Sequence, residues 1–218
     1  MRLINSILIV GACFVFSHHV TAATIATRWA GSAVTSIDRS ATFDGLDYIH
    51  NGTSISDYTE DSLFIGTDGD SFSGRGPAFP PYFNPFHIPM DPATQAFYFP
   101  DEGNRDWVTI QTTDSQKIIA VEFLYGNGWT TGDIYGVPWG NDNAFVEWQT
   151  LNDGVVVSSG QVGPNPLLPV GTILGFYDPD GFDQLLMKCR IAGSVIPELQ
   201  ALAMDNLQVQ LSETPAQP

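Results

Sequence analysis

Three aspartates stand directly before apolar stretches of this 218-residue chain: Asp44, Asp183 and Asp205. In each stretch the apolar residues recur at every second position, which is the spacing of one face of a β-strand. A carboxylate at the head of a buried face is costly unless a cation or hydrogen-bond donors compensate its charge. Calcium is a suitable cation, because it takes about six to eight oxygen ligands.

Basic partners for these carboxylates are scarce, since 8 lysines and arginines stand against 24 aspartates and glutamates. We therefore predict that Asp44 and Asp205 share a structural calcium ion, and that Asp183 is a further candidate ligand. The alternative is that the three side chains cap turns by accepting hydrogen bonds from backbone N–H groups. The acidic loops 67–72 and 178–183 are looser candidates, and neither matches the helix–loop–helix calcium pattern.

Aromatic rings gather in the glycine-rich stretch 126–143, which carries Trp129, Tyr135 and Trp139. Flat rings stack on sugar rings, and the Asn and Asp side chains nearby can bond to hydroxyl groups. We predict that this set binds a polysaccharide or cell-surface glycan. The alternative is that individual rings plug one end of the fold.

Catalytic patterns are weak in this chain. Glu122 and Glu147 lie on the polar faces of two consecutive predicted strands, and a pair of carboxylates on one sheet face is what a glycosidase uses. An ordinary solvated sheet face has the same pattern. No Gly-x-Ser-x-Gly motif is present, and His50 and His87 are far apart in sequence. The sequence therefore names no catalytic residue.

Short stretches of alternating apolar and polar residues must position these side chains, and Gly, Pro, Asn and Asp separate them. The clearest stretches are 23–29, 41–49, 62–66, 107–112, 117–125, 144–151, 154–162, 170–176, 183–191 and 205–211. Residues 152–154 (Asn-Asp-Gly) predict a β-hairpin turn, and residues 177–181 predict another turn. The pattern predicts an all-β fold, a single antiparallel β-sandwich of jelly-roll type over residues 23–211. The one helical pattern is 197–207.

Composition limits the partners of this chain. The formal net charge is -16, so the surface repels nucleic acid and anionic membranes. Hydrophobic residues make up 43% of the chain, which is enough for a sizeable core.

Residues 1–22 have the features of a signal peptide: Arg2, an apolar run, and Val20-Thr21-Ala22 before the expected cleavage site. We therefore expect a secreted, extracellular protein, with the periplasm as an alternative location. A lipoprotein anchored through Cys13 is a second alternative. No later stretch is long and apolar enough to span a membrane. Residues 212–218 are expected to form a disordered tail.

Once Cys13 leaves with the signal peptide, Cys189 is the last cysteine and has no disulfide partner. Its parity places it on the buried face of a strand, where we expect an inert thiol.

Several short motifs resemble those of secreted bacterial β-sandwich proteins that carry a PEP-CTERM sorting tail. They are Phe43-Asp44-Gly45-Leu46, Tyr58, Gly181-Phe182-Asp183 and Ala203-Met204-Asp205-Asn206-Leu207. The pattern of the first and last strands is also similar to that of jelly-roll carbohydrate-binding modules. In those modules an acidic residue near the first strand and an aspartate in the last strand help to hold a structural calcium ion, which implies the same role for Asp44 and Asp205. The sorting tail is absent here, which favours free secretion.

Together these features predict a secreted, non-catalytic module that binds a glycan or an extracellular matrix component. A structural or adhesion protein without a small ligand and a polysaccharide-cleaving enzyme are the alternatives.

Overall fold

Alternating burial marks the strands, as their period of two requires. In strand β6 (Val108–Thr112), Val108, Ile110 and Thr112 are buried and the two residues between them are partly exposed. The computed structural model describes residues 25–28, 32–44, 57–67, 97–101, 107–127, 144–165, 173–191 and 200–213, and every helix or strand among them is a strand.

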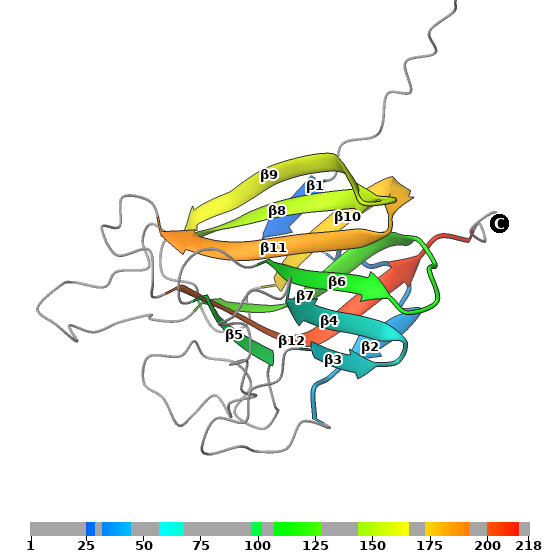
Figure 1. Ribbon diagram of the computed structural model, residues 1–218, viewed down its shortest axis with the longest axis horizontal. Helices are drawn as coiled ribbons and strands as arrows, with labels where there is room; N and C mark the ends of the chain where they lie inside the picture. Colours follow the sequence, from blue (N-terminus) through cyan, green and yellow to red (C-terminus); the bar gives the residue numbers. More distant parts are fainter. Residues whose placement is uncertain are drawn as a thin grey trace, which may run out of the picture.

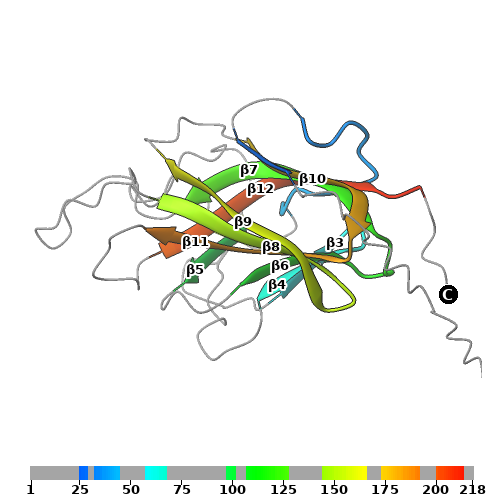
Figure 2. The same cartoon turned by 90° about the horizontal axis from the view of Figure 1, so that it is seen from above.

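The strands form two antiparallel sheets that pack face to face (Figure 1). The first sheet has the order β1 (Ile25–Arg28), β10 (Ile173–Phe182), β7 (Ile118–Asn127), β12 (Gln200–Leu211) and β2 (Arg39–Ala41), and β5 (Phe97–Asp101) also pairs with β12. The second sheet has the order β3 (Asp57–Glu60), β4 (Leu63–Thr67), β6, β11 (Gln184–Ile191), β8 (Ala144–Asn152) and β9 (Val155–Asn165). Figure 2 shows the two layers from above. The predicted all-β sandwich is confirmed.

Eight of the strands form four antiparallel pairs, and each pair encloses the preceding one in sequence, so that together they make one long ribbon. Strand β8 pairs with β9, β7 with β10, β6 with β11, and β2 with β12. The first and last members of this ribbon, β2 and β12, lie side by side although they come from opposite ends of the chain.

Large side chains from both sheets fill the space between the layers. Phe123 and Phe176 of the first sheet and Leu185 of the second are at most 1% exposed. Trp148 of β8 packs edge-on against Phe176 across the interface, with ring centroids 5.7 Å apart. Fully burying one such side chain contributes roughly 1.5–3 kcal/mol, so this core is the main stabilising contact between the sheets.

Strand parity is confirmed in β11, where Leu185 and Met187 are fully buried. The backbone of Cys189 is the next position of that parity and pairs with Val146. Its side chain lies outside the described residues, so its burial stays a prediction.

Residues 32–38 lie across the outer face of the first sheet and cover Glu122 of β7. The Glu122 carboxylate accepts hydrogen bonds from the Ser32 hydroxyl (2.9 Å) and the Val34 N–H (3.2 Å). The N–H of Asp38 donates to a backbone carbonyl of β12. This segment therefore fastens the beginning of the described chain to its last strand.

A β-bulge interrupts β12 at Asn206, which has a φ of 49°. The pairing with β7 shifts directly after Asp205, which pairs with Leu124 on the outer face of the first sheet, whereas Leu207 and Val209 are buried in the core. The prediction that Asp205 leads the apolar face of Leu207 is therefore wrong. The extra residue of the bulge reverses the parity of the strand.

The surroundings of Asp44 also differ from expectation. Strand β2 ends at Ala41, Phe43 has a φ of 62°, and Asp44 is a turn residue outside that strand. Residues 45–49, the rest of the predicted strand, lie outside the described residues.

Two segments that were predicted as a turn and as a helix belong to strands. Residues 177–181 belong to β10, where the pairing with β7 jumps between Tyr177 and Phe182. The expected turn is therefore a bulge within a continuous strand. The helical pattern is wrong over 200–207, because those residues form the first part of β12.

Candidate functional site

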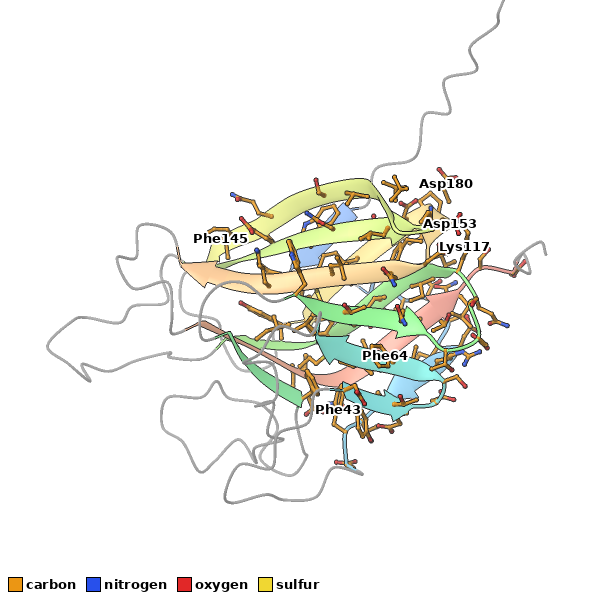
Figure 3. The ribbon with its side chains drawn as sticks, viewed as in Figure 1. Phe43, Phe64, Lys117, Phe145, Asp153 and Asp180 are labelled. Atoms are coloured by element: carbon orange, nitrogen blue, oxygen red, sulfur yellow. The ribbon has the colours of Figure 1, made fainter. Side chains whose placement is uncertain are left out.

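Three turns meet at one end of the sandwich: 113–117 between β6 and β7, 153–154 between β8 and β9, and residue 183 between β10 and β11. A cavity of about 470 Å³ lies between them. It is lined by Gln111, Thr112, Ser115, Gln116, Lys117, Asp153, Gly154, Asp183 and Gln184. Lys117 and Asp153 are labelled at this end in Figure 3.

The β8–β9 hairpin supplies one wall of the cavity. Its two loop residues, Asp153 and Gly154, have φ angles of 49° and 73°, as a type I′ turn requires. The Asp183 carboxylate accepts a hydrogen bond from the Asp153 N–H (2.7 Å), and the Asp183 N–H donates to Leu151 (2.8 Å). The predicted hairpin turn is confirmed, and Asp183 holds it in place.

Lys117 is held on another side of the cavity. Its Nζ donates to the side-chain oxygen of Asn152 (3.2 Å), and the Asn152 amide donates to the Gly181 carbonyl (3.2 Å). Gly181 has a φ of 74°, and an added Cβ would meet the Lys117 side chain at 3.3 Å. The Asn152 amide therefore links the ammonium group to the bulge in β10.

A pair of amides forms the floor that joins β6 and β11. Gln111 and Gln184 are cross-strand partners, and Gln184 Nε2 donates to Gln111 Oε1 (2.6 Å). This bond uses one end of each amide. The Gln111 NH₂ group and the Gln184 oxygen remain as a donor and an acceptor side by side.

The β6–β7 turn is braced from the first sheet. The Arg39 guanidinium of β2 pairs with the Asp114 carboxylate, and Arg39 Nη1 also donates to the Asp61 carbonyl (3.3 Å). Desolvation acts to raise the pKa of Asp114, but the hydrogen bonds from Arg39 and from the Gln116 backbone outweigh it and hold that pKa below its ordinary value. The turn beside the cavity is thus tied to the rest of the fold.

The cavity presents amides, hydroxyls, carboxylates and one ammonium group, and none of its described lining residues is aromatic. Such a lining suits a ligand with many hydrogen-bonding groups, such as a sugar.

A second polar cluster surrounds Glu60 of β3, at the edge of the second sheet. Its carboxylate accepts hydrogen bonds from the N–H groups of Thr42 (3.2 Å) and Phe43 (3.1 Å) and from the Tyr58 hydroxyl (2.8 Å). Burial, the bond to Glu60 and the negative charges of Glu60 and Asp44 raise the pKa of Tyr58 to about 12. Asp44 therefore lies at the surface near Tyr58, where it is exposed.

Asp205, the other predicted calcium ligand, is fully buried. Its carboxylate accepts a hydrogen bond from the N–H of Asn206 (2.7 Å), the bulged residue. This contact and the one between Asp183 and Asp153 are of the capping kind that was the alternative to calcium.

Asp44 and Asp205 do not belong to a metal-ligand cluster among the described residues. In the part of the chain that the structure describes, no three His, Cys, Asp or Glu side chains form a group suited to a metal ion. Two carboxylates supply at most four of the roughly six to eight oxygen ligands of calcium, so these two residues do not complete a shell. The calcium site stays a prediction.

Asp183 is too far from Asp205 to bind the same ion. Phe182, its neighbour, pairs with Ile118 of β7, whereas Asp205 pairs with Leu124. Six strand positions span roughly 20 Å, and carboxylates on one calcium ion lie within about 5 Å of each other.

The predicted sugar-stacking residues Trp129, Tyr135 and Trp139 lie outside the described residues. The strand ends that flank them are described. Strand β7 leads away from the cavity and ends at Asn127, and β8 begins at Ala144 and leads back to it. These two ends are therefore at the end of the sandwich opposite the cavity.

The alternative glycosidase pair is not formed. Glu122 projects from the outer face of the first sheet beneath residues 32–38, and Glu147 projects from the outer face of the second sheet, where it pairs with Lys188 (3.8 Å). The prediction assumed that consecutive strands are neighbours, but β7 and β8 belong to different sheets.

Sequence reasoning missed Lys117 and the two glutamines of the cavity. They are polar residues near strand ends and carry no motif. The available indication was their position beside turns, since Gln184 directly follows Asp183 and Lys117 begins a predicted strand.

Comparisons with protein-family models, curated proteins and solved structures gave no match. Within the described ranges, none of the elements is a helix of the length and apolar character that crossing a membrane requires.

Proposed function

We propose that this protein is a secreted, non-catalytic module that binds a glycan or another polyhydroxylated extracellular component. The observation that carries the proposal is the cavity between the three turns, which combines amide, hydroxyl, carboxylate and ammonium groups in about 470 Å³. This volume suits one or two sugar units, since small-ligand pockets span roughly 300–1,000 Å³.

The rigidity of the cavity supports binding. Asp183 holds the hairpin turn, Asn152 holds Lys117, and Gln111 and Gln184 hold each other. Polar groups fixed in this way lose little conformational entropy when a ligand arrives, which favours affinity.

We infer further that the sandwich is a jelly roll. The nested pairing of β8–β9, β7–β10, β6–β11 and β2–β12 supports this connectivity, because a jelly roll is a long antiparallel ribbon wrapped into two sheets. The predicted signal peptide, residues 1–22, supports an extracellular site of action.

Binding to a panel of immobilised glycans, followed by calorimetry with the best ligand, tests the function. Gln184→Ala should weaken that binding about fivefold to tenfold, because it removes hydrogen bonds to the ligand. Gln149→Ala on the outer face of β8 is the matched control and should bind as the wild type does.

Three results would contradict the proposal. Absence of binding to every glycan would favour a structural or adhesion protein. Binding that is unaffected by Gln184→Ala would exclude the cavity. Release of reducing ends from a bound polysaccharide would show an enzyme.

A further inference from the structure

We propose that the cavity selects uncharged and amine-bearing sugar units and rejects acidic ones. This inference rests on the proposed glycan binding and concerns its selectivity.

The charges that line the cavity are unbalanced. Two carboxylates, Asp153 and Asp183, face one ammonium group, that of Lys117. The described hydrogen bond of Lys117 Nζ goes to the neutral amide of Asn152. The basic side chain that reaches the adjoining turn, Arg39 of β2, is engaged by Asp114. A uronic acid or a sulfate ester entering this space therefore meets net negative charge.

The neutral part of the lining matches hydroxyl groups. Each sugar hydroxyl donates one hydrogen bond and accepts others, and Gln111 and Gln184 present an amide donor and an amide acceptor next to each other. The Asp183 carboxylate, beside Gln184 in sequence, can accept hydrogen bonds from hydroxyl or ammonium groups of the ligand. An amino sugar gains an additional attraction from both carboxylates.

The effect belongs to the cavity and not to the whole acidic surface. The Debye length at physiological ionic strength is about 8 Å, so distant surface carboxylates are screened. Charges inside a partly enclosed cavity are screened less, and they act directly on a bound sugar.

Matched hexamers provide the test: β-1,4-linked glucose, glucosamine and glucuronate, and β-1,4-linked mannose and mannuronate. Calorimetry in about 0.15 M salt measures their affinities. We expect the neutral or amino hexamer of a series to bind about tenfold or more tightly than its acidic counterpart.

A double variant, Asp153→Asn with Asp183→Asn, removes both charges and retains the turn. Asparagine adopts a positive φ readily at position 153, and Asn-Gly is a preferred type I′ pair. At position 183 the asparagine oxygen can still accept the turn N–H. Loss of the carboxylate hydrogen bonds affects both hexamers, so the readout is their ratio: the affinity for the acidic hexamer relative to its neutral counterpart should rise about tenfold. The melting temperature reports whether the variant is folded.

The control variant carries Asp57→Asn and Glu147→Gln, which remove two charges outside the cavity. It should leave the ratio between acidic and neutral hexamers unchanged. An equal effect of both double variants would overturn the local origin of the selectivity. Equal binding of acidic and neutral hexamers would overturn the selectivity and leave glycan binding intact. Absence of binding to all five hexamers and to every glycan of the panel would overturn both proposals.

Discussion

At the scale of single residues, one carboxylate stabilises an unfavourable backbone conformation. Phe43 has a φ of 62°, which costs a non-glycine residue roughly 1–2 kcal/mol. The Glu60 carboxylate accepts the N–H groups of Thr42 and Phe43, and the Phe43 ring packs against Tyr58 and Phe97 at centroid distances of 5.5 and 5.9 Å. The buried ring and the satisfied amides offset the strain.

The Tyr58 hydroxyl in this cluster predicts a stability change at alkaline pH. Its pKa rises from 10.0 to about 12 in the folded protein, so between these values the unfolded chain loses a proton that the folded protein keeps. The contribution of the Tyr58 hydroxyl to the free energy of unfolding is complete below pH 10 and declines as the pH rises towards about 12. Urea unfolding at a series of pH values should show this decline in the wild type and a shallower decline in Tyr58→Phe.

Tyr177→Phe is the control for that measurement, because Tyr177 is a tyrosine with 38% of its surface exposed. If Tyr58→Phe retains the full alkaline slope of the wild type, the Tyr58 hydroxyl is not the cause of the decline in stability.

At the scale of elements, periodicity predicts strands well and bulges badly. The parity of β6 and β11 and the Asn-Asp-Gly hairpin follow directly from the residue pattern. The face of Asp205 does not, because one left-handed residue, Asn206, reverses the register. Asparagine tolerates this conformation, but the sequence alone does not show which asparagine adopts it.

The alternation of apolar and polar residues also does not indicate to which sheet a strand belongs. Glu122 and Glu147 have the predicted outward parity on their strands, and the error lay in placing β7 next to β8. Likewise, the cavity residues are assembled by three turns from distant parts of the chain, so no local spacing relates Lys117 to Gln184. Long-range pairing decides both arrangements.

The loop between β7 and β8 provides a prediction at this scale. If Trp129 and Trp139 form a stacking platform, replacing both with alanine should abolish glycan retention on an affinity gel and leave the melting temperature nearly unchanged. The strand ends that flank the loop lie opposite the cavity, so Gln184→Ala serves as an independent comparison. A loss of several kcal/mol in unfolding free energy would instead identify the rings as core plugs.

At the scale of the whole molecule, the net charge of -16 favours cation binding. We propose that a calcium ion at Asp44 and Asp205 links the beginning and the end of the sandwich. An ion that binds only the folded state adds about 2.7 kcal/mol when its free concentration is a hundredfold above its Kd. Chelation should therefore lower the melting temperature by about 5–10 °C.

Variants separate the candidate ligands in that experiment. Asp205→Asn should remove most of the response to chelator, whereas Asp183→Asn, roughly 20 Å away along the strand direction, should retain it. If chelator does not change the melting temperature of the wild type, the calcium site does not exist. Asp205 is then the cap of its bulge and Asp183 the cap of the hairpin.

The pairing of β2 with β12 has a consequence for the order in which this protein can fold. Leu211 N–H donates to the Asp38 carboxylate across 173 positions of sequence. Until β12 is present, β2, β5 and β7 each lack the strand that they flank, and their open edges can pair with other chains. Closing so long a loop is slow, because its entropy is lost before the contacts form. The strand β12 must therefore be available before the ribbon can close. This order agrees with folding after export, as the predicted signal peptide implies. A fragment truncated before residue 200 should aggregate, because it lacks β12.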